Sequence, residues 1–344
     1  MKSIHDERAL KDFFLENKIP AFRYWQIENA LYKNFINDFQ DIQTIPKELR
    51  EKLRDNFFYS SMTIEKEVTS ENGQTTKILW KTSDDKLIES VIMRHLSGRN
   101  TLCISSQAGC PMACSFCATW KLGLLRNLEC HEIIEQVIYA AKLLSEQWSV
   151  LRNVVYMGMG EPFLNYENVK KSIQVICEQK KLNLANRRVT VSTCWIIPGI
   201  KKFGHDFPQT SLAISIHAPN DEVRSKIMPV DHTYPLKDLM DSLDQYVKET
   251  NKKIFYEYIM IAGVNDSIFL ADELGKLLEW RLAHVNFIPY NPGEWTGGTY
   301  QATPKFIIEK FQRILEKYWI PSTIRATMGD DINAACWQLA NKEA

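Results

Sequence analysis

A series of alternating strand-like and helix-like segments, which begins near residue 100, constrains the fold of this 344-residue chain most strongly. Such alternation predicts parallel strands joined by crossover helices that cover the outside of the sheet. Either an open doubly wound sheet or a partial barrel would satisfy this pattern, and ligands gather at the carboxyl ends of the strands in both. The expected strands are 102–105, 153–159, 188–193, 211–217, 253–261 and 285–289, and the expected helices are 131–145, 166–180, 198–205, 235–250 and 267–280, followed by a helix at 304–318 and a strand at 322–326.

The first 90 residues have a different pattern. Segments 6–16, 23–38 and 46–56 have helical periodicity and many charges, whereas Thr76–Thr82 and Leu87–Met93 alternate as strands of a hairpin do. We therefore expect two domains: residues 1–90 form a small, mainly helical accessory domain with a connecting hairpin, and residues 91–344 form the core.

Charge and hydropathy restrict the protein class only weakly. Lys plus Arg and Asp plus Glu number 42 each, so the net charge is zero and only a local basic patch could favour nucleic acid. The sequence contains no run of 18 apolar residues, and its charged N-terminus lacks the apolar stretch of a signal peptide. We expect a cytoplasmic protein without a membrane partner, whose thiols stay reduced.

Three cysteines lie close together directly after the first strand of the series. Cys110, Cys114 and Cys117 have the spacing C-x3-C-x2-C. Three thiolates on one loop can bind three irons of a [4Fe-4S] cluster and leave the fourth iron open to chelate S-adenosylmethionine. The alternative is a zinc site with Cys103 as the fourth ligand, although structural zinc sites usually use two separate cysteine pairs.

The sequence around these cysteines resembles the radical S-adenosylmethionine superfamily. More narrowly, Cys103-Ile-Ser-Ser-Gln-Ala-Gly-Cys110, then Cys117-Ala-Thr and Arg126-Asn-Leu, is similar to the RlmN/Cfr family of RNA adenine methyltransferases. The similarity extends from about residue 20 to residue 340. It implies a partial (β/α)6 barrel, and an accessory domain that helps to bind RNA.

Polar and glycine residues follow several predicted strands. Glycines in Met157-Gly-Met-Gly-Glu161 would let the backbone approach a ligand, and Glu161 could accept hydrogen bonds from its ammonium group. From the residues alone, a plain strand-to-helix turn explains this motif equally well, and hydroxyls at strand ends more commonly satisfy backbone groups. The resemblance implies that the cofactor is bound by Gly160, Glu161, Ser192, Ser215, Ile216, His217 and Asn291.

Three further residues receive catalytic roles from the resemblance. An isolated late cysteine such as Cys336 is usually buried filler, but a thiolate is also a good nucleophile towards a sulfonium methyl group. In the family this cysteine carries the methyl group, and each turnover uses two S-adenosylmethionine molecules. Cys103 is then expected to release the product by forming a disulfide with Cys336, and Glu89 to accept a proton. A cellular reductant such as a flavodoxin system would be needed.

The position that is methylated remains open between two branches of the family. Methylation of adenosine carbon-2 in 23S rRNA, with tRNA as a further substrate, is favoured by the sequence Gly160-Glu161-Pro162 and by Asp330-Asp331. Methylation of carbon-8, as in Cfr, is favoured by the 14-residue spacing from Glu89 to Cys103. An alternative of another class is a zinc-stabilised RNA-binding protein without catalytic activity.

Two tryptophans depart from the family pattern. Trp120 and Trp337 stand where glycine is usual, so both add bulk near the expected site. The phosphate contacts are less visible in the sequence, and the candidates are Arg126, Arg187, Arg188, Lys201 and Lys202. We expect the protein to be a monomer.

Overall fold

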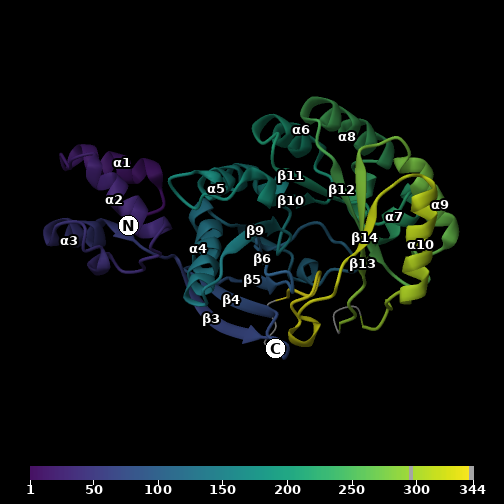
Figure 1. The fold of residues 1–344 in the computed structure, drawn as a ribbon, viewed down its shortest axis with the longest axis horizontal. Coiled ribbons are helices and arrows are strands. Elements are labelled where there is room, and N and C mark those ends of the chain that lie inside the picture. Colours follow the sequence, from purple (N-terminus) through teal and green to yellow (C-terminus); the bar gives the residue numbers. More distant parts are fainter. Residues whose placement is uncertain (294–296, 341–344) are drawn as a thin grey trace.

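The computed structural model describes residues 1–293 and 297–340. A bundle of N-terminal helices lies beside a large mixed sheet, and further helices cover the outside of that sheet (Figure 1). The helices are α1 Glu7–Glu16, α2 Phe22–Tyr32, α3 Lys47–Asn56, α4 Cys130–Glu146, α5 Tyr166–Cys177, α6 Ile197–Asp206, α7 Asp221–Ile227, α8 Leu236–Thr250, α9 Ile268–Leu278 and α10 Lys305–Lys317. None of the helices in these described ranges is long and apolar enough to cross a membrane.

The strands form one large sheet and two small ones. The ten-stranded sheet has the order β14-β13-β12-β11-β10-β9-β6-β5-β4-β3, while β1 pairs with β2 and β7 pairs with β8. The strands are β1 Lys2–Ser3, β2 Phe57–Phe58, β3 Met62–Thr69, β4 Thr75–Thr82, β5 Leu87–Arg94, β6 Asn100–Cys103, β7 Gln107–Gly109, β8 Leu124–Asn127, β9 Leu151–Tyr156, β10 Val189–Thr193, β11 Ser211–Ser215, β12 Ile254–Met260, β13 Ala283–Pro289 and β14 Ser322–Ile324.

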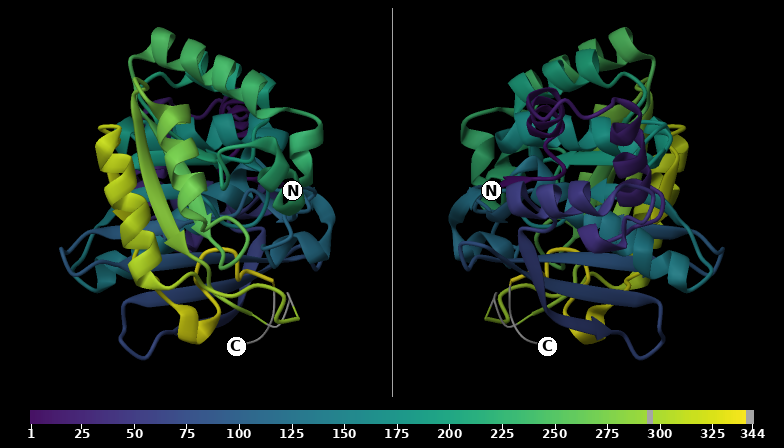
Figure 2. Two further views of the ribbon diagram at one scale, coloured as in Figure 1. Left: turned by 90° about the vertical axis from the view of Figure 1, so that its right-hand side faces the viewer. Right: turned by 90° about the vertical axis from the view of Figure 1, so that its left-hand side faces the viewer.

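The strand order decides between the two architectures that the sequence left open. A doubly wound sheet reverses its strand order at one point, whereas β6, β9, β10, β11, β12 and β13 are neighbours in chain order and parallel. Because β-crossover-β connections are right-handed, crossovers that all advance in one direction place their helices on one face. The sheet curves with these helices outside (Figure 2). The predicted partial barrel is therefore confirmed.

The antiparallel strands β3, β4 and β5 extend the same sheet beyond β6. The N-terminal helices, in contrast, have a separate hydrophobic core that contains residues up to Phe57 and two residues of α4, Ile134 and Ile138. The core of the large sheet begins at Met62. The two cores thus meet at the short segment between Phe57 and Met62.

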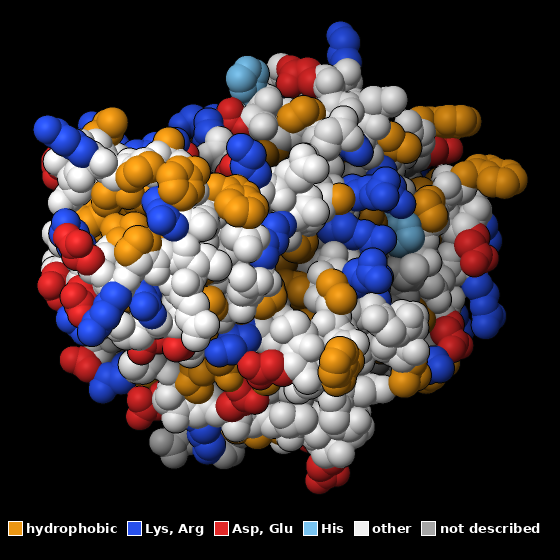
Figure 3. All heavy atoms as spheres, turned by 60° about the vertical axis from the view of Figure 1, so that its left-hand side comes forward, with side chains coloured by type: hydrophobic (Ala, Val, Ile, Leu, Met, Phe, Trp, Pro, Cys, Tyr) orange, Lys and Arg blue, Asp and Glu red, His pale blue; other side chains and the backbone are white. Residues whose placement is uncertain are grey.

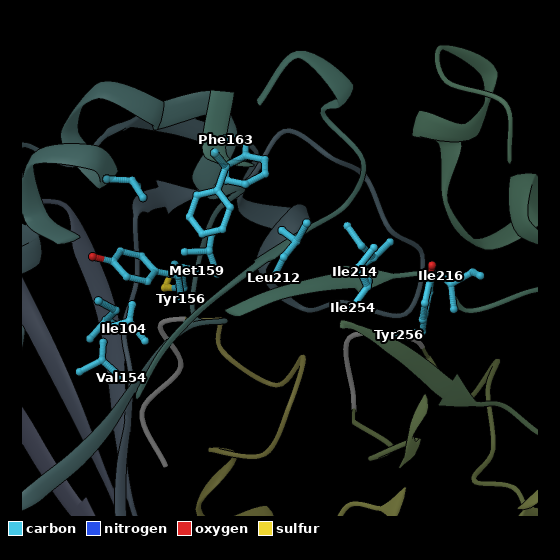
Figure 4. Close-up of a cluster of buried hydrophobic side chains, with 14 of the residues drawn as sticks. Ile104, Val154, Tyr156, Met159, Phe163, Leu212, Ile214, Ile216, Ile254 and Tyr256 are labelled. Carbon is cyan, nitrogen blue, oxygen red and sulfur yellow. The ribbon is translucent and has the colours of Figure 1, made fainter. Parts of the chain in front are cut away.

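The barrel strands bury apolar residues against the outer helices. Val189, Val191 and Thr193 of β10 are buried and alternate with Thr190 and Ser192, which are half-buried. Figure 4 shows how side chains from β9, β11 and β12 pack together in this layer. The inner face carries polar side chains, including Thr101, Asn153 and Asn286, around a space of about 1150 Å³. Apolar packing therefore lies outside the strands, and the interior is left for polar groups.

Glu135 of α4 holds the segment that joins the two cores. Its carboxylate accepts hydrogen bonds from the Ser60 hydroxyl at 2.7 Å and from the Ser61 and Met62 N–H groups at 3.1 and 3.2 Å. Burial raises the pKa of this carboxyl group to about 7. These hydrogen bonds replace those that the carboxylate would form with water if it were exposed.

We predict that Glu135→Ala lowers the free energy of unfolding by about 2–3 kcal/mol, because buried N–H donors lose a charged acceptor. The control is Glu146→Ala, since Glu146 is an exposed residue of the same helix. Urea denaturation of both variants measures the difference. Equal stability of the two variants would contradict the role assigned to Glu135.

Candidate active site

The three clustered cysteines lie on a loop between β7 and β8. These strands pair antiparallel, and the Cys110 N–H donates to the Gly123 carbonyl at 3.0 Å. Gly109 has φ +76°, and a Cβ atom there would lie 1.8 Å from the Gly123 carbonyl oxygen. Only glycine fits this position, so the neck of the loop is closed tightly enough to turn the cysteines towards the barrel.

The cysteine loop faces a cavity of about 770 Å³ at the carboxyl ends of the parallel strands. Cys110, Cys114 and Cys117 line it together with strand-end residues that the sequence singled out, namely Gly160, Glu161, Ser192, Ser215 and His217. Trp120 and Trp337 line the same cavity. The structure thus brings together side chains separated by more than 200 residues in the sequence.

The three thiols are compatible with an iron–sulfur cluster. Burial raises the pKa of Cys117 to about 11, and a bound cation reverses such an effect because it stabilises the thiolate. In the described residues no three His, Cys, Asp or Glu side chains converge closely enough to hold a single metal ion. Each iron of a cluster, in contrast, can bind a separate thiolate. Cys103, the fourth ligand of the zinc alternative, does not line this cavity.

Gly160 and Glu161 have local structural roles beside the cavity. Gly160 has φ +101°, and a Cβ atom there would lie 2.5 Å from the Gln107 Cβ. The Glu161 carboxylate accepts the N–H groups of Cys194 at 2.6 Å and Phe163 at 3.0 Å. Burial raises the pKa of Glu161 to about 7. This carboxyl group therefore orients two neighbouring loops while it lines the cavity.

His217 offers a polar atom that has no partner in the described part of the chain. Its Nδ1 accepts the Ile259 N–H at 3.1 Å, and its Nε2 is buried without a hydrogen bond. Burial lowers the pKa of His217 to about 3, so the ring is neutral and Nε2 carries the proton. This N–H is available to a ligand in the cavity. Ile216, in contrast, buries its side chain in the core (Figure 4).

A second cavity, of about 600 Å³, adjoins the first. Cys103 and Asn291 line it, and Cys336 lines both cavities. Burial raises the pKa of Cys103 to about 12, and the nearby Cys336 charge adds to this effect. Asn291 accepts a hydrogen bond from the Thr327 hydroxyl at 3.1 Å. Cys336 thus stands between the cluster cysteines and Cys103.

The segment that carries Cys336 is bound firmly to the cysteine loop. The Ala118 N–H donates to the Trp337 carbonyl at 2.8 Å, and the Thr119 hydroxyl donates to the Leu339 carbonyl at 2.7 Å. The Asp331 carboxylate accepts the Glu71 N–H at 2.9 Å, which ties the segment to the turn after β3. These contacts explain how a late cysteine reaches the site.

All eight cysteines of the chain are free in the structure. The disulfide between Cys103 and Cys336, which the resemblance implied, is therefore absent. Both residues nevertheless line one cavity.

Glu89 is buried in β5 and pairs with the Lys77 ammonium group at 3.3 Å. It is not among the residues that line either cavity. Val91, two residues further along β5, pairs with Cys103 and lines the second cavity. Since alternate residues of a strand share a face, Glu89 lies on the Cys103 side of the sheet.

Two residues of the site, Arg325 and Cys194, were not predicted from the sequence. Arg325 follows β14 and lines both cavities, and the charge of Cys336 holds the pKa of its guanidinium group above the usual range. Cys194, interpreted as structural, lines the first cavity, where its hydrogen bond with Cys114 raises the pKa of the Cys114 thiol. Neither residue stands in a motif, so only the strand order could have placed them.

Arg126, a candidate phosphate contact, is already paired within the protein. Its guanidinium group binds Asp84 at 2.7 and 2.9 Å and Glu132 at 2.7 Å. Arg187 and Arg188 are exposed. Arg126 therefore stabilises the end of β8, whereas Arg187 and Arg188 remain accessible.

The chain matches two protein-family models. Residues 5–58 match the ribosomal RNA large subunit methyltransferase N-terminal domain, and residues 104–272 match the radical SAM superfamily. The second match supports S-adenosylmethionine and a [4Fe-4S] cluster as the cofactors, in agreement with the buried cysteine set described above.

Known relatives resemble the chain over nearly its whole length. The probable dual-specificity RNA methyltransferase RlmN of Clostridium novyi is 42% identical over 96% of this chain and 94% of its own. That of Staphylococcus saprophyticus is 40% identical over 97% and 91%. The crystal structure of a radical SAM methyltransferase from Sphaerobacter thermophilus superimposes with a TM-score of 0.95 at 38% identity and covers 99% of this chain and 100% of its own. The chain therefore belongs to the RlmN family of radical S-adenosylmethionine RNA methyltransferases.

Proposed function

We propose that this enzyme methylates carbon-2 of an adenosine in 23S rRNA, and of an adenosine in tRNA, through an S-methylcysteine on Cys336. The observation that carries the proposal is the position of Cys336, which lines both the cavity of the cluster cysteines and the cavity of Cys103. The relatives' name, dual-specificity RNA methyltransferase, supports more than one RNA substrate.

Cys110, Cys114 and Cys117 would hold a [4Fe-4S] cluster, and two S-adenosylmethionine molecules would be used in each turnover. When bound, these groups supply first a methyl cation and then a 5′-deoxyadenosyl radical. The His217 Nε2–H, the Ser192 and Ser215 hydroxyls and the backbone at Gly160 would bind and orient the cofactor. Asn291, which lines the neighbouring cavity, would bind the part nearest Cys336.

Cys336 is suited to accept a methyl group because a cysteine sulfur is a good nucleophile towards a sulfonium methyl group. Arg325 lines both cavities together with it. The Glu257 carboxylate lies 3.5 Å from the Arg325 guanidinium and keeps that group at the rim of both cavities. Arg325 would therefore help to bind the cofactor's reacting end beside Cys336.

Cys103 and Glu89 would act after the methyl carbon is bonded to adenine. We propose that the Cys103 thiolate attacks the Cys336 sulfur, so that a disulfide forms as the bond between this sulfur and the methylene carbon breaks. The released carbon takes up a proton and becomes the methyl group, and the one electron left over would pass to the [4Fe-4S] cluster. A cellular reductant such as flavodoxin then reduces the disulfide. Glu89 would take the proton lost from the ring carbon, and its ion pair with Lys77 would hold the carboxylate in place.

RNA would approach through the open side of the barrel and over the N-terminal helices. Lys and Arg side chains surround a hollowed part of the surface in Figure 3. His95, Arg99 and Arg325 line the polar space inside the barrel, and positive groups there favour phosphate. Of the expected accessory domain, residues 1–90, we propose that the N-terminal helices help to bind RNA. The hairpin strands at its end, which carry Glu89, would belong with residues 91–344 in the catalytic part.

The product identifies the position that is methylated. We predict 2-methyladenosine in both ribosomal and transfer RNA when the protein is expressed in a bacterial strain without such a methyltransferase. Nuclease digestion and mass spectrometry of the two RNA pools measure it, and the empty vector is the control. Detection of 8-methyladenosine instead would reject carbon-2 in favour of the position that the Glu89–Cys103 spacing suggested.

Replacement of the methyl carrier separates the methyl transfer from cluster assembly. We predict that Cys336→Ala abolishes RNA methylation, by at least ~1000-fold, since no nucleophile remains to receive the methyl group, while bound iron is unchanged. Cys177→Ala, which changes a half-buried cysteine of α5, is the control and should retain full activity. Methylated RNA from the Cys336 variant would refute the proposed carrier.

Replacement of the second catalytic cysteine should stop the reaction at a later stage. We predict that Cys103→Ala leaves the protein bonded to RNA through Cys336, because nothing attacks the Cys336 sulfur. A denaturing gel with labelled RNA detects the adduct, and the double variant Cys103→Ala/Cys336→Ala should form none. A Cys103→Ala variant that releases methylated RNA at the normal rate would show that Cys103 is dispensable.

A further inference from the structure

Five tryptophans have a backbone conformation that tryptophan rarely adopts. Among the described residues, thirteen other than glycine have positive φ, and five of these are tryptophan although the whole chain has only nine. For a bulky L-residue positive φ is strained, and the usual exceptions are Asn, Asp and His. The five are Trp148 (φ 55°), Trp195 (99°), Trp280 (64°), Trp319 (58°) and Trp337 (67°).

Two of them occupy the position after a helix at which glycine is usual. After α4, the Ser149 N–H donates to the Leu144 carbonyl at 2.8 Å and the Trp148 N–H donates to the Ser145 carbonyl at 3.0 Å. After α10, the same pair of bonds is formed by the N–H groups of Ile320 and Trp319, at 3.1 and 3.0 Å. This is the Schellman motif, whose left-handed residue is most often glycine because it lacks a Cβ atom.

Two more occupy the third position of a tight turn. Glu279 has φ −53° and ψ 136°, Trp280 has φ 64°, and the Arg281 N–H donates to the Leu278 carbonyl at 3.0 Å. These values define a type II turn, which requires glycine or asparagine at the place of Trp280. Trp337 stands in the equivalent place of the turn that the Gln338 N–H closes on the Ala335 carbonyl at 3.1 Å.

The exposed rings gain no packing to offset this strain. The exposed fractions of Trp148, Trp280 and Trp319 are 99%, 92% and 91%. Trp80 behaves differently: it is buried in β4, has an ordinary φ, donates to the Ser90 hydroxyl at 2.8 Å and packs edge-on against Tyr139. The surroundings of Trp80 thus select tryptophan at that position, whereas the surroundings of Trp148, Trp280 and Trp319 do not.

Of the other two rings, that of Trp195 is buried in the core of the large sheet and that of Trp337 is half-buried in the cavity of the cluster cysteines. The Arg224 guanidinium carbon lies 2.6 Å from the centre of the Trp195 ring, nearer than carbon atoms normally approach, and the Trp195 indole N–H has no partner in the described residues. The Trp337 ring packs against Phe116 and His217 within the cavity of the cluster cysteines. The Trp337 ring therefore takes space that a ligand in this cavity would need.

We infer that these five positions hold glycine in the natural protein, and that the codon at each is UGA. The same codon, UGA, can give either residue, because some genetic codes read it as tryptophan and others read it as glycine. Glycine fits all five backbone conformations without strain. At position 195 it also removes the close contact with Arg224, and at position 337 it removes a ring that packs against His217 in the cavity of the cluster cysteines. This inference rests on backbone geometry and is independent of the proposed function.

The gene and the native protein test the inference directly. We expect UGA at codons 148, 195, 280, 319 and 337, and UGG at codon 80. Peptide mass spectrometry of the protein from its natural source should give the mass of glycine at the five positions and of tryptophan at position 80. UGG codons at the five positions, or tryptophan in those peptides, would overturn it.

A stability measurement tests the same inference without the native source. Two chains made from synthetic genes are compared, the printed sequence and a variant with Trp148→Gly, Trp195→Gly, Trp280→Gly, Trp319→Gly and Trp337→Gly. Relief of five strained conformations should raise the midpoint of thermal unfolding by roughly 5–10 °C. Trp80→Gly, the matched control, should lower it. A quintuple variant that is less stable than the printed sequence would contradict the inference.

Discussion

The active site depends on the uniform winding of the parallel strands. Because β6, β9, β10, β11, β12 and β13 follow one another in chain order, every crossover helix lies outside and all carboxyl ends meet at one rim. Loops from distant parts of the chain converge there: the cysteine loop after β7, the Gly160–Glu161 turn after β9 and His217 after β11. The buried apolar layer between strands and helices keeps this rim rigid, so that the interior can remain polar.

The C-terminal segment completes the site that the barrel begins. Hydrogen bonds to Ala118 and Thr119 hold it on the cysteine loop, and Asp331 binds it to the turn after β3. The antiparallel extension of the sheet therefore has two tasks: it supports Cys103 through the β5–β6 pairing, and it anchors the loop that carries Cys336. One thiol reaches two cavities because two independent parts of the fold position its loop.

Backbone conformation shows which positions of the chain require glycine. At Gly109 and Gly160 a side chain is excluded by close contacts, as short distances to Gly123 and Gln107 show. The five left-handed tryptophans stand in turns and caps of the kind that glycine serves elsewhere in proteins. Trp337, a departure from the family pattern, is among them, so the glycine that we infer at this position would remove its bulk from beside Cys336. Trp120 has no such backbone signature.

The sequence by itself determined the order and type of the main elements, the N-terminal helices and the three clustered cysteines, because periodicity and short spacings are local properties. It did not reveal β3, the β7–β8 hairpin or α7, which are short or lack clear periodicity. Only the tertiary structure chose a partial barrel over an open sheet, since that choice depends on strand order. It alone brought Arg325 and Cys194 to the site and paired Arg126 with Asp84 and Glu132, because contacts between residues far apart in sequence arise from packing and leave no mark in the local pattern.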